Sequence, residues 1–338
     1  MKNPMKNLYD RLKGRGFDQK FVQAAILPDW WEDSLAENPA NMAIAENAIA
    51  RHLGFKIAQL SDPCCLLDIP QACNFRFKRR TGTKPSEIMP AAMVAQRAAK
   101  LIADHLSGVP AFVGRKSAPQ IRNSILHDHP LVNLQRLIRY CWRNGIAVFH
   151  VLPDRLPRLS KKFQGVCMYC GRIPIVILGS GRASPPWLAF HLAHEVGHIM
   201  LSHVKAGDCP LVDPNIDSKV GNDRQDDEVD IFATEILTGE KQLAFKPKYG
   251  MDAAVLSEAA KSYGQGNAID PGTVALIYGR SANRWGPAQI ALKALEEDSG
   301  AHEIISQALK QHVAVDDMSE STTRLLSSLA VLGPGFNA

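Results

Sequence analysis

The sequence lacks any long apolar segment and any regular set of cysteines. Its 338 residues contain no apolar run of about 18 residues, so we expect no membrane-spanning helix. Residues 1–17 carry charges without an apolar stretch behind them, so we expect no secretory signal. The seven cysteines are odd in number and irregularly spaced, which favours reduced thiols over a disulfide framework. These absences predict a cytoplasmic protein without a membrane partner.

Internal repeats and long low-complexity segments are also missing from the chain. The composition is that of a globular protein, with 46% hydrophobic and 22% charged residues, and the length suggests two or three units. We expect a helical amino-terminal region over residues 1–112, a central unit over residues 113–245 and a helical carboxy-terminal region over residues 246–338.

Charge is unevenly distributed along the chain, although the formal net charge is only +5. The basic stretch over residues 76–116 contains the best candidates for contact with nucleic acid or a partner, namely Arg76, Lys78, Arg79 and Arg80. Residues 42–63 have a helix–glycine–helix rhythm around Gly54, which is weakly like a helix-turn-helix unit. A solvated basic face and an ordinary helical hairpin are the alternative interpretations, so DNA is a candidate partner only.

The middle of the chain changes from helical to mixed character. Residues 131–145 predict a helix, and residues 146–152 predict a strand after it. Residues 163–179 predict a β-hairpin that turns around Gly171. We therefore expect an α+β fold in which a small sheet or hairpin lies beside the helix that follows.

That next helix carries four histidines in a mostly apolar segment, residues 187–204, and Pro185-Pro186 marks its start. His194 and His198 are four residues apart, so they lie on one helical face with Cβ atoms about 5–6 Å apart. Two imidazoles so placed can reach one ion at about 2.0–2.1 Å. Glu195 projects to the side of that face, where its carboxylate can approach a metal-bound water. Hydrogen-bonded core histidines are the alternative, but they do not explain a buried carboxylate between the two rings.

A catalytic zinc ion usually has three protein ligands, so a third is expected from the acidic start of a second helix. The acids there are Asp226, Asp227, Glu228 and Asp230, and the helix dipole alone accounts for most of them. We favour Glu228, because it allows Phe232 and Leu237 to pack while its carboxylate points at the first helix. Spacing alone leaves Asp227 open.

The two segments together resemble the ImmA/IrrE family of metallopeptidases. Residues 190–198, FHLAHEVGH, match that family's aromatic–x–Leu-Ala-His-Glu-x-Gly-His block. Residues 228–233, EVDIFA, match its second block, whose glutamate is the third zinc ligand. The resemblance covers about residues 145–240 and implies a zincin-like α+β domain with a hairpin beside the active-site helix. It also selects Glu228 over Asp227, and it places His191 where the family commonly has Ser or Thr.

We therefore predict a zinc-dependent endopeptidase with one Zn²⁺ ion per chain, held by His194, His198 and Glu228. Glu195 is expected to act as general base on zinc-bound water. The resemblance implies a helix-turn-helix repressor as the protein substrate, in stress response, mobile elements or toxin–antitoxin systems. The alternative function is a DNA-binding transcription regulator or antitoxin-like module with a regulatory metal site.

Several other side chains are candidates for supporting roles near the zinc. Asp230 is a candidate to orient a ligand histidine, with a plain first-turn acid as its alternative role. A second donor to the oxyanion is also expected, and its candidates are His191, His203, Tyr263 and Tyr278.

Overall fold

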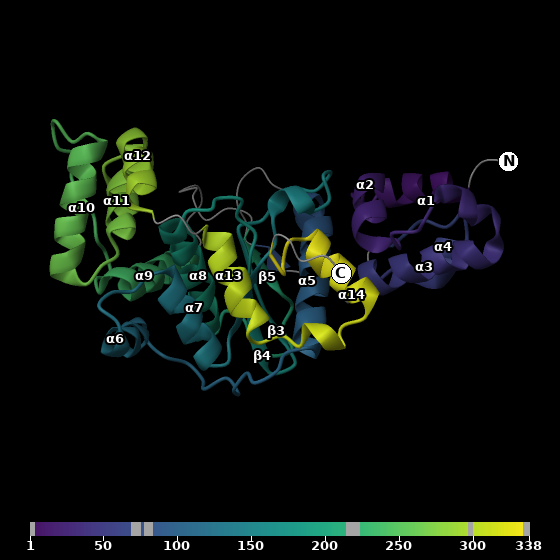
Figure 1. Cartoon of the computed structure of the whole chain (residues 1–338), viewed down its shortest axis with the longest axis horizontal. Helices are drawn as coiled ribbons and strands as arrows, with labels where there is room; N and C mark the ends of the chain where they lie inside the picture. Colours follow the sequence, from purple (N-terminus) through teal and green to yellow (C-terminus); the bar gives the residue numbers. More distant parts are fainter. Residues whose placement is uncertain (1–3, 69–75, 78–83, 214–223, 297–299, 334–338) are drawn as a thin grey trace.

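The computed structural model describes residues 4–68, 76–77, 84–213, 224–296 and 300–333. The fold is a mostly helical α+β arrangement in which helices surround one small mixed sheet (Figure 1). The α+β expectation is confirmed at this level. Within these residues, no helix combines the length and the apolar character that crossing a bilayer requires.

The sheet has five strands in the order β1-β5-β3-β4-β2. Its strands are β1 (Arg76–Phe77), β2 (Ala147–His150), β3 (Gly165–Cys170), β4 (Ile173–Leu178) and β5 (Leu211–Asp213). β3 and β4 form the predicted antiparallel hairpin, and Gly171 adopts the left-handed conformation that its turn requires, with φ of +59°. β2 pairs parallel to β4, which confirms the strand expected after residue 145.

The described part of residues 4–61 is helical. Its elements are α1 (Pro4–Lys13), α2 (Gln19–Phe21), η1 (Val22–Ile26), η2 (Asp33–Glu37), α3 (Pro39–Leu53) and α4 (Ile57–Ser61). Asn38 accepts a hydrogen bond from the Ala40 amide at the start of α3, and Gly54 ends this helix with φ of +76°. The helix–glycine–helix rhythm is therefore real, but its second helix has only five residues.

Helices cover the sheet from several directions. Those that pack on its strands include α5 (Pro85–Asp104), α7 (Leu134–Arg143) and α8 (Pro185–Met200). Outside them, α6 (Ala118–Asp128) packs on α7 and α9 (Arg224–Thr238), and α9 packs on α8. Figure 1 shows α5 and α8 on either side of the strands, and both pack against β3 and β4. Because β4 is covered in this way, Ile175 to Leu178 are buried without alternation.

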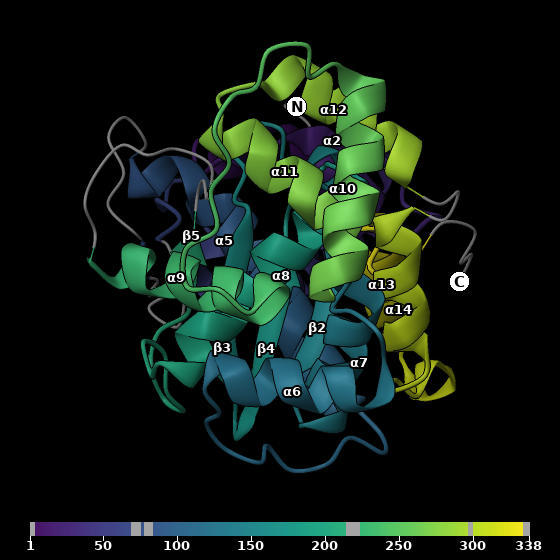
Figure 2. The same ribbon diagram turned by 90° about the vertical axis from the view of Figure 1, so that its left-hand side faces the viewer.

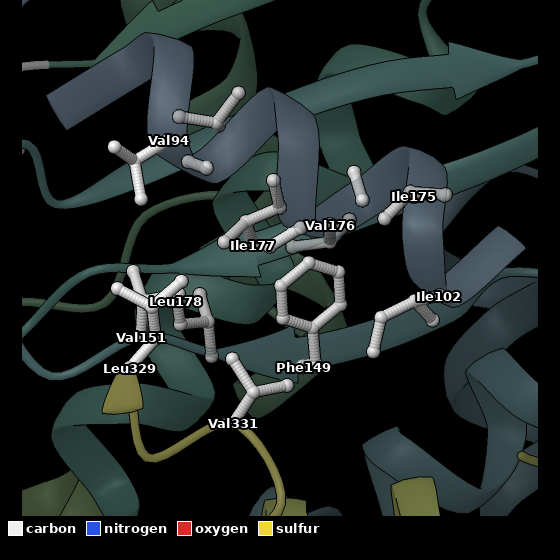
Figure 3. Close-up of a cluster of buried hydrophobic side chains, with 14 of the residues drawn as sticks. Val94, Ile102, Phe149, Val151, Ile175, Val176, Ile177, Leu178, Leu329 and Val331 are labelled. Carbon is white, nitrogen blue, oxygen red and sulfur yellow. The ribbon is translucent and has the colours of Figure 1, made fainter. Parts of the chain in front are cut away.

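The main hydrophobic core surrounds these central strands. Figure 3 shows Phe149 of β2 next to the β4 side chains, with Val94 and Ile102 of α5 on one side. Leu329 and Val331 close the cluster from the carboxy-terminal end of the chain. The cluster runs from Met5 to Leu332, so all three expected regions contribute to one core.

The carboxy-terminal part of the chain divides between two places. α10 (Ala253–Asn267), α11 (Pro271–Ser281) and α12 (Trp285–Leu295) form a bundle with a second hydrophobic cluster, at the left of Figure 1. In the turned view of Figure 2, α11 lies across α8, with which it packs. α13 (Ala301–Lys310) and α14 (Glu320–Ser328) instead return to the main core beside β2 and α5.

Candidate metal centre

The centre of the site is α8, which is buried on nearly all sides. Ser184 precedes the helix, and Pro185 and Pro186 occupy its first turn, where a missing amide proton costs nothing. α8 packs against α7, α9, α11, β3 and β4. A Cβ atom added at Gly197 would lie 3.2 Å from Val229 and 3.3 Å from Phe232, so this glycine permits the close approach of α9.

His194 and His198 are fully buried on α8 and face each other. Their Nε2 atoms are 3.3 Å apart. Two nitrogen ligands at about 2.0–2.1 Å from one tetrahedral ion are separated by about 3.3–3.4 Å. The separation in the protein therefore matches that of two ligands on a shared ion.

Asp226 of α9 completes the group that could hold a metal ion. Its carboxylate and the two imidazoles offer ligand atoms that all lie within 4.8 Å of one another, and all three residues are buried. Two histidines and a carboxylate are a donor set typical of catalytic zinc. Among the residues described by the structure, this is the metal-competent group of histidine, cysteine and acidic side chains.

In the structure, Asp226 joins His194 and His198 in this group, whereas the sequence favoured Glu228. The buried face of α9 includes Asp226, Val229 and Ala233, at spacings of three and four residues. Glu228 is about 200° further round the helix than Asp226, at about 100° per residue, and its side chain is 46% exposed. Asp227 is exposed as well.

Asp230 holds the Nδ1 side of the His194 ring. His194 Nδ1 lies 2.9 Å from Asp230 Oδ1, and Arg280 Nη2 of α11 lies 2.9 Å from Asp230 Oδ2. Burial raises the pKa of Asp230, but the hydrogen bond and charge of His194, together with Arg280, outweigh burial and leave this pKa below its ordinary value. The carboxylate is therefore ionised and accepts the Nδ1 proton, which supports the orienting role expected of Asp230.

His203 holds the Nδ1 side of the His198 ring. After α8, Ser202 adopts a left-handed conformation with φ of +63°, and the His203 amide donates to the His198 carbonyl at 2.9 Å. This is a Schellman turn, which folds the chain back so that His203 Nδ1 lies 2.9 Å from His198 Nδ1. His203 Nε2 lies 3.6 Å from Glu228 Oε2. Glu228 therefore reaches the metal-competent group through His203.

These contacts are compatible with one tautomer for each of His194 and His198. His194 donates from Nδ1 to a carboxylate, so its Nε2 carries the lone pair. His198 donates from Nδ1 when His203 donates its Nε2 proton toward Glu228, and then its Nε2 also carries a lone pair. Two lone pairs 3.3 Å apart repel each other unless a proton or a cation lies between them. The residues present therefore fit a bound divalent ion.

Glu195 lies beside this group and against the sheet. Its side chain is 1% exposed, and its carboxyl packs on the backbone of Gly165 at the start of β3. A Cβ atom at position 165 would overlap the Glu195 carboxyl. The glycine is therefore required for this placement of Glu195, and no signal in the sequence pointed to it.

The remaining candidates are spread over different surroundings. His191 is buried one turn before His194, between the rings of Trp187 and Phe190 at 5.8 and 6.5 Å. Tyr278 is buried in the α10–α12 cluster, and its hydroxyl has no hydrogen-bond partner among the described residues. Tyr263 is 37% exposed and packs edge-on against Phe245.

The basic candidates lie mostly outside the part of the chain that is described. Arg76 is in the short strand β1, which pairs with β5. Lys78, Arg79 and Arg80 fall outside the described residues. Their proposed role in contacting nucleic acid stays a prediction.

Two residues of this arrangement were not selected from the sequence. Asp226 had a usable signal, because its spacing to the apolar residues of α9 places it on the buried face. Arg280 had none, since it meets Asp230 only when α11 packs across α8, 50 residues away in sequence from that carboxylate.

Comparison with known proteins gives no independent assignment. Searches against protein-family models, curated proteins and solved structures found no match to this chain.

Proposed function

We propose that this protein is a zinc-dependent metallopeptidase. The observation that carries the proposal is the convergence of His194 and His198, with Nε2 atoms 3.3 Å apart, on the buried carboxylate of Asp226. His194, His198 and Asp226 would hold the ion. A bound zinc ion supplies Lewis-acid chemistry, because it acidifies water and polarises a carbonyl oxygen.

Glu195 has the position of a general base in this proposal. It follows His194 directly in the sequence, is absent from the ligand group, and is held against Gly165 of β3. Its carboxylate would take a proton from an attacking water and deliver that proton to the leaving amine nitrogen of the peptide. Peptide hydrolysis then needs no further proton donor from the chain.

The outer partners support the same function. Asp230 and His203 would keep the two ligand imidazoles in the tautomer and orientation that ligation requires. We further propose that residues 113–245 are a zincin-like unit, since a helix with the His-Glu-x-x-His pattern lies beside a small mixed sheet. The substrate to test first is a helix-turn-helix repressor, which rests only on the family resemblance.

Metal content and cleavage together test this function. Purified protein is expected to contain about one zinc ion per chain by elemental analysis. Glu195→Gln should retain that zinc and lose cleavage of repressors encoded nearby, whereas Glu235→Gln, on the same second helix as Asp226, should change neither. A folded protein that binds no zinc at micromolar concentrations would reject the proposal.

A further inference from the structure

A separate cavity lies between α7 and α13. Its volume is about 510 Å³, which is within the size range of small-molecule sites. Figure 1 shows the two helices side by side near the middle of the molecule, and they pack against each other. None of the residues that line this α7–α13 cavity belongs to the site described above.

The cavity is lined by positive charge without a compensating acid. Arg136, Arg139 and Arg143 follow one another along α7 at spacings of three and four residues, so they share a face of the helix. Its lining contains no aspartate or glutamate. At about 1.5 Å per residue, the first and last arginine are about 10 Å apart along the helix, so an extended anion can meet more than one guanidinium.

The three arginines differ in the hydrogen bonds and ion pairs that they already form. Arg136 Nη1 donates to the Leu131 carbonyl at 3.1 Å, which fixes this side chain over the cavity wall. Arg143 lies 3.6 Å from Asp128, but both side chains are more than half exposed, so this pair is weak. Arg139 is exposed and lies between the other two. Five guanidinium donors per arginine suit the oxygens of phosphate groups.

Polar and aromatic side chains supply the rest of the lining. Trp142 and His312 stack with ring centroids 4.4 Å apart and an angle of 19° between the planes, and both line the cavity. The amide side chains there are Gln135, Gln307 and Gln311. Rings and amides beside a row of arginines suit a ligand that joins a flat polar group to phosphates.

We propose that the α7–α13 cavity binds a small phosphate-bearing ligand of the nucleotide class. The three arginines contact the phosphate oxygens, and the amides and the ring pair contact the remainder of the ligand. A small ligand is favoured over a nucleic-acid strand because the site is a bounded cavity rather than a long basic surface. The inference does not depend on the peptidase proposal, because it uses none of the residues of the metal-competent group.

Calorimetric titration of the full-length protein with ADP and with inorganic pyrophosphate tests this inference. The informative variant is Arg139→Gln combined with Arg143→Gln, since neither side chain has a buried partner to lose. Both probes should bind this variant at least about tenfold more weakly, because charge-assisted hydrogen bonds are lost. Arg172→Gln, at the exposed β3–β4 turn, removes the same charge elsewhere and should bind within about twofold of the unchanged protein.

Three results would overturn the inference. The first is no binding of either probe at millimolar concentration, and the second is equal binding by the double variant and the unchanged protein. The third uses a single-stranded DNA oligonucleotide as a further probe. Tighter binding of this DNA than of ADP, lost in the same double variant, would assign the cavity to nucleic acid instead. Equal melting temperatures of the variants would show that folding is not the cause.

Discussion

His52 and His150 are each 2% exposed, almost as buried as His194 and His198, yet their surroundings differ in kind. Burial, followed by the positive charges of Arg97, Arg51 and Arg324, lowers the pKa of His52 to about 4. Burial and the neighbouring His302 lower the pKa of His150 to about 3. Burial has therefore made these two histidines neutral core residues.

His194 and His198 of α8 have polar side chains around them instead. Each has its Nδ1 held by another side chain, and each turns its Nε2 toward the same point near Asp226. Neither ring nitrogen of His52 has a hydrogen-bond partner in the described part of the chain. The difference teaches that convergence and outer partners, rather than burial, distinguish a metal centre from a histidine in the core.

The largest expected effect is a loss of peptide cleavage without a loss of bound zinc. Gly165→Ala should lower peptide cleavage by about 10²–10⁴-fold, the usual contribution of a general base, because the new methyl group displaces the Glu195 carboxyl. Zinc content, measured by elemental analysis, should stay unchanged. Gly266→Ala is the matched control, because a Cβ atom there meets nothing within 4 Å. Full cleavage by Gly165→Ala would show that Glu195 is not the base.

The next effect decides which acid belongs with the histidine pair. Asp226→Asn should weaken zinc binding by more than about 100-fold, which exceeds the usual cost of losing an outer partner, because Asp226 is in the converging group. Glu228→Gln should weaken zinc binding by about tenfold at most, since Glu228 acts through His203. Competition with a chromophoric chelator measures both affinities. A larger loss in Glu228→Gln would restore the glutamate ligand that the family resemblance implies.

The two outer partners should differ in strength. Asp230→Ala should cost about 10–100-fold in zinc affinity, because His194 loses a charged acceptor that Arg280 fixes in place. His203→Ala should cost less, about tenfold or below, because His198 loses a neutral acceptor. Asp227→Ala, an exposed acid on the same helix, is the control in the same chelator competition. Equal zinc affinity in all three variants would contradict the orienting role of both partners.

The smallest effect tests the neutral core histidines. The pKa of His52 is about 4 in the folded protein and about 6.5 when unfolded, so the unfolded chain binds the proton first as pH falls. The free energy of unfolding is therefore highest above pH 6.5, and His52 removes about 1 kcal/mol of it between pH 6 and pH 5. Denaturant unfolding of His52→Leu should show a shallower loss over this interval.

Exposed His127 provides the control for that measurement. His127→Leu makes the same substitution at an exposed position, where the side chain has no buried surroundings to lose. The same slope in His52→Leu and in the unchanged protein would mean that His52 is not held neutral by folding. The contrast between His52, as a neutral core histidine, and the pair His194 and His198 would then be lost.

Most helices and the hairpin were predictable because their signals are local. Pro185-Pro186 in the first turn of α8, Gly54 after α3 and Gly171 between β3 and β4 each act within one turn of the chain. The packing of all three expected regions into one core had no such local signal. Leu329 and Val331 join the core around Phe149, and that contact spans more than half of the sequence.

The metal-competent group shows the same limit. His194 and His198 were predictable because a spacing of four residues alone puts two side chains on one helical face. The acidic cluster alone could not decide among Asp226, Asp227 and Glu228, because each of these acids is compatible with a helix start. It depends on the rotation of α9, which is set by the apolar residues that pack on α8 at Gly197.

The sequence by itself determined the helix that carries the histidine pair, the glutamate between them and the acidic helix that follows, because periodicity and end signals act over a few residues. Only the tertiary structure decided that Asp226 faces the pair, that Glu228 meets it through His203, and that Gly165 and Arg280 complete the surroundings. These contacts join segments that lie far apart in the chain, and their geometry is set by how α8, α9, α11 and β3 pack together.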